Sequence, residues 1–144
     1  MKTKVTRHEE FETAHLLPNY NGPCGNLHGH SYKIEVTVEG DSDDGFGMII
    51  DFNHLKKAIK ECVPDHKFIF FEDDIISQEI IKVLDKYHLK YESYPFYTTA
   101  ENMVEYFAYK IENYLHINYP NIYVVEVKLW ETTNSYAVWR KENE

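Results

Sequence analysis

The stretch CGNLHGHSYKIEV contains two histidines two residues apart, His28 and His30, and a cysteine, Cys24, four residues before the first of them. The residues after His30 alternate between polar and apolar types, which predicts a β-strand with one buried face. Side chains two apart on a strand point to the same side of the sheet, so the two imidazoles can approach one metal ion. The motif alone is also compatible with two solvated or hydrogen-bonded histidines.

A third histidine, His15, lies near the end of the segment that is expected to form the first strand. It shares strand parity with Phe11 and Thr13, so its ring should face inward, and a hairpin would bring it near the other two histidines. Three imidazoles with an open coordination position are typical of catalytic zinc. The pattern therefore favours a metal site built from two strands.

Cys24 has two interpretations. It could be the fourth ligand of a closed Cys-His₃ site, in which case the zinc would be structural. It could instead stand beside an open zinc and act as a base or nucleophile, activated by the metal or by a protonated histidine. Its loop, NYNGPCGN, is rich in Gly, Pro and Asn, which favours an exposed functional thiol. Cys62, on the apolar stripe of a predicted helix, is expected to be buried and inert.

Three further places carry groups that could take part in chemistry. The adjacent pair Asp65 and His66 could move a proton, the alternative being a solvated turn. Glu131 continues the parity of an apolar strand face, where a carboxylate is costly unless paired, so it could accept two N–H groups of a ligand. Glu101 follows Thr98 at the spacing of a capping box, and that structural role alone can explain it.

The elements that must position these residues follow from apolar periodicity. We expect an irregular strand over 4–15, strands over 30–40, 122–131 and 136–141, helices over 51–63, 77–88 and 99–117, and a turn-rich loop at 41–47. This order predicts an α+β domain, a four-stranded antiparallel sheet with helices on one face. Its two open edges would need protection or pairing with another subunit.

The same periodicity predicts which side chains are buried. One strand should bury Tyr32, Ile34, Val36 and Val38. A later strand should present one apolar face made of Tyr123, Val125, Val127 and Leu129. The first helix, with Asp51 as its N-cap, should have a stripe made of Phe52, Leu55, Ile59 and Cys62.

Length and composition narrow the class of protein. The 144 residues are enough for a single domain over 1–144. The net charge of −9, from 15 basic and 24 acidic residues, argues against a nucleic-acid partner. We expect no membrane span and no secretory signal, because the chain has no run of 18 apolar residues. Two cysteines make no disulfide framework, so a cytoplasmic location is expected.

In their order along the chain, these motifs resemble the 6-pyruvoyltetrahydropterin synthase and 6-carboxytetrahydropterin synthase family. The resemblance covers most of the chain and rests on FETAH (11–15), CGNLHGH (24–30), MIIDFNHLK (48–56), DHKF (65–68), TAEN (99–102) and ETTNSYAVW (131–139). It implies the tunnelling fold, in which the sheets of neighbouring subunits join into a barrel. It also implies a homo-oligomer, usually a hexamer made of two trimers.

The resemblance also implies roles for individual residues. The zinc ligands would be His15, His28 and His30. The catalytic set would be Cys24, Asp65 and His66. The pterin would be anchored by Glu131, with Glu101 and Thr99 as further substrate contacts. The substrate would be 7,8-dihydroneopterin triphosphate, a small molecule.

Within the family, the three-residue gap between Cys24 and His28 resembles the bacterial carboxy-forming enzymes of the queuosine route. This implies a zinc-dependent lyase that forms 6-carboxy-5,6,7,8-tetrahydropterin with loss of triphosphate and acetaldehyde. The alternatives are the pyruvoyl-forming enzyme, a folate-route pterin lyase, and a non-catalytic pterin-binding or structural-zinc protein. The chain departs from the family's usual pattern at Pro64, at Thr98 and in lacking an Asn after His66.

Overall fold

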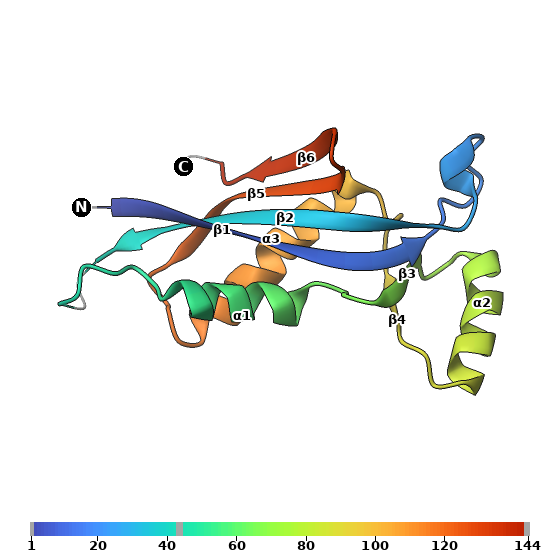
Figure 1. The fold of residues 1–144 in the computed structure, drawn as a ribbon, viewed down its shortest axis with the longest axis horizontal. Helices are drawn as coiled ribbons and strands as arrows, with labels where there is room; N and C mark the ends of the chain where they lie inside the picture. Colours follow the sequence, from blue (N-terminus) through green and yellow to red (C-terminus); the bar gives the residue numbers. More distant parts are fainter. Residues whose placement is uncertain (1, 43–44, 143–144) are drawn as a thin grey trace.

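The computed structural model describes residues 2–42 and 45–142, and its described strands form one six-stranded sheet with the order β4-β3-β1-β2-β5-β6 (Figure 1). The elements are β1 (Lys2–His15), the short 3₁₀ helix η1 (Pro23–Gly25), β2 (His28–Asp41), α1 (Phe52–Cys62), β3 (Lys67–Phe71), α2 (Ile75–Lys86), β4 (Tyr91–Tyr94), α3 (Ala100–His116), β5 (Tyr123–Thr132) and β6 (Ser135–Arg140). The two termini lie at one end of the molecule, and the loop between β1 and β2 lies at the other (Figure 1). No helix of the described residues is both long and apolar enough to cross a membrane.

The expected sheet of four antiparallel strands is present, but the sheet is larger and mixed. β3 pairs in parallel with β1, and β4 pairs in parallel with β3. The prediction of four strands was wrong because these two strands are only five and four residues long. The run FIFF in β3 has no polar–apolar alternation, and periodicity cannot assign a segment that short.

The β1–β2 hairpin is the longest regular feature of the sheet. Every residue of β1 has a partner in β2, from Lys2 opposite Asp41 to His15 opposite His28, so β1 is a regular strand and not the irregular one expected. The predicted buried face of β2 is confirmed: Tyr32, Ile34, Val36 and Val38 have no exposed surface. This face packs against α1 and α3; in Figure 1, α3 passes behind the strands and α1 lies below them.

The helices begin where short polar side chains cap them. The predicted cap of α1 is confirmed, because the Asp51 carboxylate accepts a hydrogen bond from the Asn53 amide. Its stripe buries Leu55, Ala58, Ile59 and Cys62, whereas Phe52, predicted to be part of it, is 52% exposed. Phe52 is the first helical residue.

The other two helices differ from the prediction at their starts. α2 begins two residues earlier than expected, after Asp74, whose carboxylate accepts from the amide and hydroxyl of Ser77. α3 is capped by Thr99, whose hydroxyl accepts from the Asn102 amide. The capping box expected between Thr98 and Glu101 is therefore not the cap of this helix, and Thr98 is free for another contact.

Two β-bulges in β5 change which of its side chains face inward. Thr37 pairs with Glu126 but Val38 pairs with Val124, which leaves Val125 as an extra residue. Buried positions therefore switch parity there: Val124 is buried while Tyr123, predicted to share the apolar face, is 40% exposed. The predicted face holds only for Val127 and Leu129.

The second bulge lies at the end of β5. Trp130 pairs with Tyr136 and Thr132 with Ser135, so Glu131 has no partner in the ladder. A bulge bends the strand and re-aims the side chain of the extra residue. Glu131 is thus directed by local backbone geometry as well as by strand parity.

The loop expected over 41–47 follows β2. Residues 43 and 44 of this loop lie outside the described residues. Gly45 and Gly47 adopt φ angles of 85° and 83°, in a region that glycine enters without steric cost.

Candidate metal centre and active site

Four side chains from β1, β2 and β5 converge at one end of the sheet: His15, His28, His30 and Glu131. Each offers one ligand atom, and these atoms all lie within 4.8 Å of one another. The Nε2 atoms of His15 and His28 are 3.1 Å apart, and His30 Nε2 is 2.9 Å from Glu131 Oε1. The hairpin register explains the histidines, because His15 lies opposite His28 and Thr13 lies opposite His30. The expected approach of the three imidazoles is observed, and their role as metal ligands stays a prediction.

The outer nitrogens of two imidazoles are held by groups outside the cluster. His28 Nδ1–H donates to the carbonyl oxygen of Asn26 over 2.6 Å. His15 Nδ1 lies 2.9 Å from Thr98 Oγ1. An imidazole protonated on Nδ1 keeps a lone pair on Nε2, which is the atom that each ring presents to the cluster. Neither contact was predicted, because neither has a signal in local residue spacing.

The residues present fit a divalent metal ion. His30 Nε2 is buried and has no hydrogen-bond partner, since Glu131 Oε1 is close but outside hydrogen-bond geometry. A buried polar atom without a partner is costly, and so are lone pairs of several imidazoles that face one another. A cation held by the three imidazoles would use their lone pairs, and the nearby carboxylate would balance its charge. Imidazole nitrogens suit zinc and other first-row transition metals.

The electrostatics of the cluster favour the forms that bind a metal. Burial lowers the pKa of His30, and the neighbouring His15 and His28 lower it further, although the Glu131 charge opposes them. The contact with His15 lowers the pKa of Glu131, and the other two histidines add to this effect against the opposing effect of burial. A neutral imidazole and an ionised carboxylate are the protonation states that metal coordination requires.

Cys24 lies on η1, in the loop between β1 and β2 at the same end of the sheet, and is half-buried. The loop is tightly folded: the Leu17 amide donates to the Cys24 carbonyl, and a Cβ on Gly25 would come within 2.3 Å of the Tyr20 carbonyl oxygen. Burial raises the pKa of Tyr32, and the charges of Glu131 and Cys24 add to that shift. The thiol thus acts on Tyr32, whose ring lies edge-on to the rings of His15 and His30. Among the described residues, the four converging ligand atoms do not include its sulfur.

Asp65 and His66 lie in the connection between α1 and β3, outside the metal cluster. Asp65 Oδ1 accepts from His66 Nδ1 and from the Glu12 amide, each over 2.9 Å, and the His66 amide donates to the Glu12 carbonyl. His66 has a φ angle of 58° and a side chain that is 76% exposed. A shallow groove along the outer edge of β1 is lined by both residues and by none of the cluster. Within one chain, the structure does not bring this pair to the histidines.

The first turn of α3 is tied to the cluster by Thr98. This residue directly precedes Thr99, the helix cap, and Glu101 follows in the first turn with an exposed side chain. The Thr98 contact with His15 therefore brings the start of α3 close to the metal centre. The substrate contacts of Thr99 and Glu101 stay a prediction.

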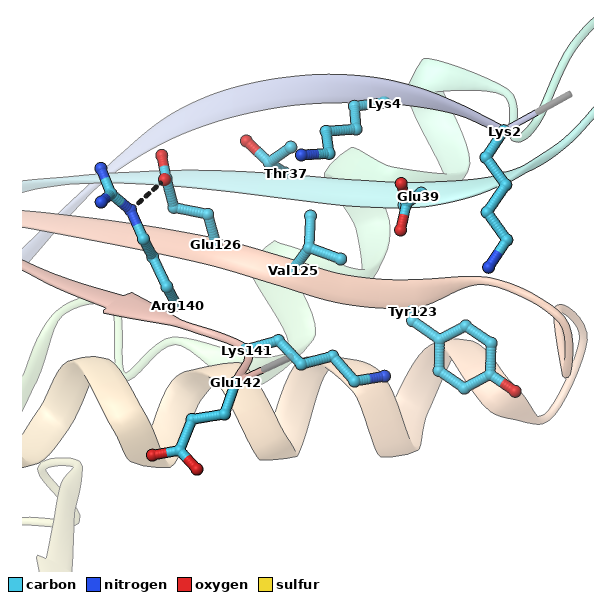
Figure 2. Close-up of a pocket in the computed structure, with 10 residues that line it drawn as sticks. All are labelled: Lys2, Lys4, Thr37, Glu39, Tyr123, Val125, Glu126, Arg140, Lys141 and Glu142. Carbon is cyan, nitrogen blue, oxygen red and sulfur yellow. Dashed lines mark hydrogen bonds and ion pairs between the residues drawn. The ribbon is translucent and has the colours of Figure 1, made fainter. Parts of the chain in front are cut away.

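A separate hollow with a volume of about 760 Å³ lies at the opposite end of β1, where the termini are. Figure 2 shows basic and acidic side chains interspersed around it, with Arg140 paired to Glu126 over 2.8 Å. Such a mixture is typical of a solvated surface. It contains none of the four residues of the metal cluster.

Comparisons with known proteins agree on one family. The family model described as 6-pyruvoyl tetrahydropterin synthase matches residues 4–142. The 6-carboxy-5,6,7,8-tetrahydropterin synthase of Haemophilus influenzae is 31% identical over 144 residues, covering 96% of this chain and 99% of that protein. The protein of the same name from Aquifex aeolicus is 32% identical, and the match covers 99% of this chain and 100% of that protein.

Solved structures show the same fold. An uncharacterized protein from Wolinella succinogenes superposes with a TM-score of 0.80 at 21% identity, and 99% of each chain is covered. The 6-pyruvoyltetrahydropterin synthase of Plasmodium vivax superposes with a TM-score of 0.73 at 15% identity, again with 99% of each chain covered. The fold is therefore the tunnelling fold that the sequence resemblance implied, with six strands in the sheet where four were expected.

The Asp65–His66 pair should make the stability of the fold depend on pH. Partial burial would raise the pKa of Asp65, but the hydrogen bond from the Glu12 amide and the nearby His66 and Lys60 outweigh it, so the pKa lies below its ordinary value. A carboxylate with a lowered pKa stabilises the fold above its ordinary pKa of 3.8, and this contribution is lost as pH falls through the lowered value.

Asp65→Asn should therefore melt below the wild type at pH 7, and the difference should shrink as the pH is taken below about 4. The difference should be small, under about 1 kcal/mol, because the pair is exposed to solvent. Thermal melts of both proteins from pH 7 to pH 3 measure it. A difference that stays constant across this range would contradict the assignment of the carboxylate as the stabilising form.

Proposed function

The chain belongs to the 6-pyruvoyl tetrahydropterin synthase family, and on that premise we propose that it is a zinc-dependent 6-carboxy-5,6,7,8-tetrahydropterin synthase. The substrate is 7,8-dihydroneopterin triphosphate, one water molecule supplies the second oxygen of the carboxylate, triphosphate and acetaldehyde are released, and the product serves queuosine synthesis. The observation that carries the proposal is the convergence of three imidazole Nε2 atoms and one carboxylate in a chain whose relatives of that name align along almost their whole length.

The ligands of the zinc are His15, His28 and His30. A bound zinc supplies Lewis acidity toward the side-chain oxygens of the substrate and so makes the neighbouring C–H bond more acidic. Cys24, half-buried at the same end of the sheet, takes the proton of that C–H group. Asp65 orients the His66 imidazole through its Nδ1, and His66 returns a proton from its other ring nitrogen.

Glu131 anchors the pterin. Its carboxylate lies against the imidazoles, and its side chain is 30% exposed, so a ligand can reach it. With the three Nε2 atoms on zinc, the carboxylate oxygens are free to accept two N–H groups from the guanidine-like edge of the pterin. Thr99 and Glu101, at the start of α3, contact the substrate from the helix side.

We infer that Asp65 and His66 serve the site of a neighbouring copy. β1 pairs with β3 only at Thr13 and Ala14, so most of its outer edge has no strand partner in the described residues. β6 is the open strand at the other side of the sheet. Open edges need partners, and β6 runs antiparallel to β1, so β6 of one copy can extend along β1 of the next. Repetition around an axis closes a barrel.

This joining would complete the active site. β6 begins at Ser135, beside Glu131 and the metal cluster. The part of the β1 edge that would pair with β6 of another copy ends beside His66. The neighbour's Asp65 and His66 would then arrive at the end of the sheet where the histidines lie. A ring of three copies, stacked in pairs as a hexamer, is the assembly that the family resemblance implied.

The reaction itself is the decisive test. Purified, zinc-loaded protein is incubated with 7,8-dihydroneopterin triphosphate, and the products are identified by mass spectrometry. We expect 6-carboxytetrahydropterin and acetaldehyde, and no product from His28→Ala, which lacks a zinc ligand. A pyruvoyl or hydroxymethyl pterin would assign the chain to another branch of the family. Absence of any product from the zinc-loaded wild type would favour a pterin-binding protein and reject the proposal.

The role of Cys24 is tested by removing its thiol. Cys24→Ala should keep about one zinc per chain and its melting temperature, while turnover falls by a factor of about 10²–10⁴, the usual worth of a positioned acid or base. Cys62 is the matched control, because burial raises the pKa of its thiol to about 11 and it lies on α1 away from the cluster. Cys62→Ala should keep its turnover. Zinc loss with retained turnover in Cys24→Ala would instead make Cys24 a structural ligand.

Sharing of the site between copies predicts complementation. Cys24→Ala and His66→Ala should each be inactive alone. Co-expressed, they should regain activity, because random assembly gives about one site in four with both residues intact. Turnover per chain of the isolated hybrid measures this. If hybrids that bind zinc and match the wild type in mass stay inactive, the two residues do not act across an interface.

A further inference from the structure

We propose that Thr98 is a positioning residue of the metal centre, whose hydroxyl fixes the tautomer and the orientation of His15 and thereby raises the affinity for the metal. The inference rests on the zinc site of the proposed function and adds a residue for which the sequence suggested only a helix-capping role. Its central observation is the contact between His15 Nδ1 and Thr98 Oγ1, which are 2.9 Å apart.

Burial makes this contact consequential. His15 and Thr98 are each 1% exposed, so bulk water cannot take the place of either hydrogen-bond partner. The two residues are 83 positions apart in the chain, so the contact forms only when the start of α3 packs against the end of β1. A buried N–H without an acceptor is costly. By offering an acceptor to Nδ1–H, the hydroxyl favours the tautomer in which Nδ1 carries the proton.

The hydroxyl is not needed by the helix. Thr99 caps α3 through the Asn102 amide, and the amide of Thr99 itself donates to the Tyr97 carbonyl. Thr98 thus stands one residue outside the helix with its side chain directed to His15. Helix formation does not explain a buried hydroxyl at this position, and the contact with the imidazole does.

The chemistry of the pair fits a metal ligand. A threonine hydroxyl can accept from an imidazole Nδ1–H, and that tautomer leaves the lone pair of Nε2 free. Nε2 of His15 is the atom that lies 3.1 Å from His28 Nε2 and 3.4 Å from Glu131 Oε1, so it is the atom aimed at the metal position. In the other tautomer, a proton on Nε2 would occupy the coordination position.

The other oriented ligand offers a useful contrast. His28 donates to a backbone carbonyl, that of Asn26, which no side-chain substitution can remove. The orientation of His15 depends on a side chain and can be removed without changing the backbone. Partners of this kind typically change metal affinity by about 10–100-fold.

The test uses zinc alone as the probe, titrated into metal-free protein in competition with a chelator of known affinity. Thr98→Val keeps the shape of the side chain and removes the hydroxyl, so it should weaken zinc binding by about 10–100-fold. Thr98→Ser restores a hydroxyl and should bind zinc within about threefold of the wild type. The rise in melting temperature on addition of saturating zinc, which follows affinity, should shrink in the valine variant only.

Ser77→Ala is the matched control. Ser77 is also 1% exposed, and its hydroxyl donates to Asp74 over 2.6 Å at the start of α2, outside the metal cluster. This variant should lose stability as the threonine variants do, and keep wild-type zinc affinity. If Thr98→Val is unfolded by circular dichroism, Thr98→Ala removes the same hydroxyl without filling space and carries the same expectation.

If the valine or alanine variant binds zinc as tightly as the wild type, this inference is overturned and the proposed function still stands. An equal loss of affinity in Ser77→Ala would also overturn it, because the effect would then be one of general stability. Wild-type protein that binds no zinc would overturn both the inference and the zinc-dependent function. The three results are distinguishable in one series of titrations.

Discussion

The register of the β1–β2 hairpin is the constraint on which the site depends. It sets His15 opposite His28 and aims His30 to the same side two residues further along. A slip of one residue would turn every side chain of a strand to the other face. The register is held by the fully buried residues of β2, among them Ile34 and Val36. The pattern that builds the core therefore also aims the imidazoles.

Around this rigid pair of strands, single contacts from distant segments complete the cluster. A bulge at the end of β5 directs Glu131 into it, and Thr98 ties the start of α3 to His15. Burial favours neutral His30, while the contact with His15 favours ionised Glu131. The site is thus prepared for a cation, and the Cys24 loop and the start of α3 lie at the same end of the sheet.

Periodicity predicts which face of a regular strand each side chain lies on. It placed His15, His28 and His30 on inward faces and identified the buried face of β2, because alternation is regular there. It failed at the bulge at Val125, where one extra residue reverses the parity of Tyr123, and at β3 and β4, which are too short to show a period. The contact of Thr98 with His15 spans 83 residues and leaves no local trace. The contacts of Asp65 and His66 with the Glu12 backbone likewise join segments far apart in the sequence, so residue spacing does not reveal where this pair lies.

X-ray absorption at the zinc edge tests the central claim most directly, because it reports the ligands of the ion in the protein as purified. We expect only nitrogen and oxygen ligands around the ion, with three imidazoles at about 2.0–2.1 Å, and the loss of one imidazole in His15→Ala. A sulfur at about 2.3 Å that disappears in Cys24→Ala would contradict it. The zinc would then be closed by the thiol, and the open catalytic centre described above would not exist.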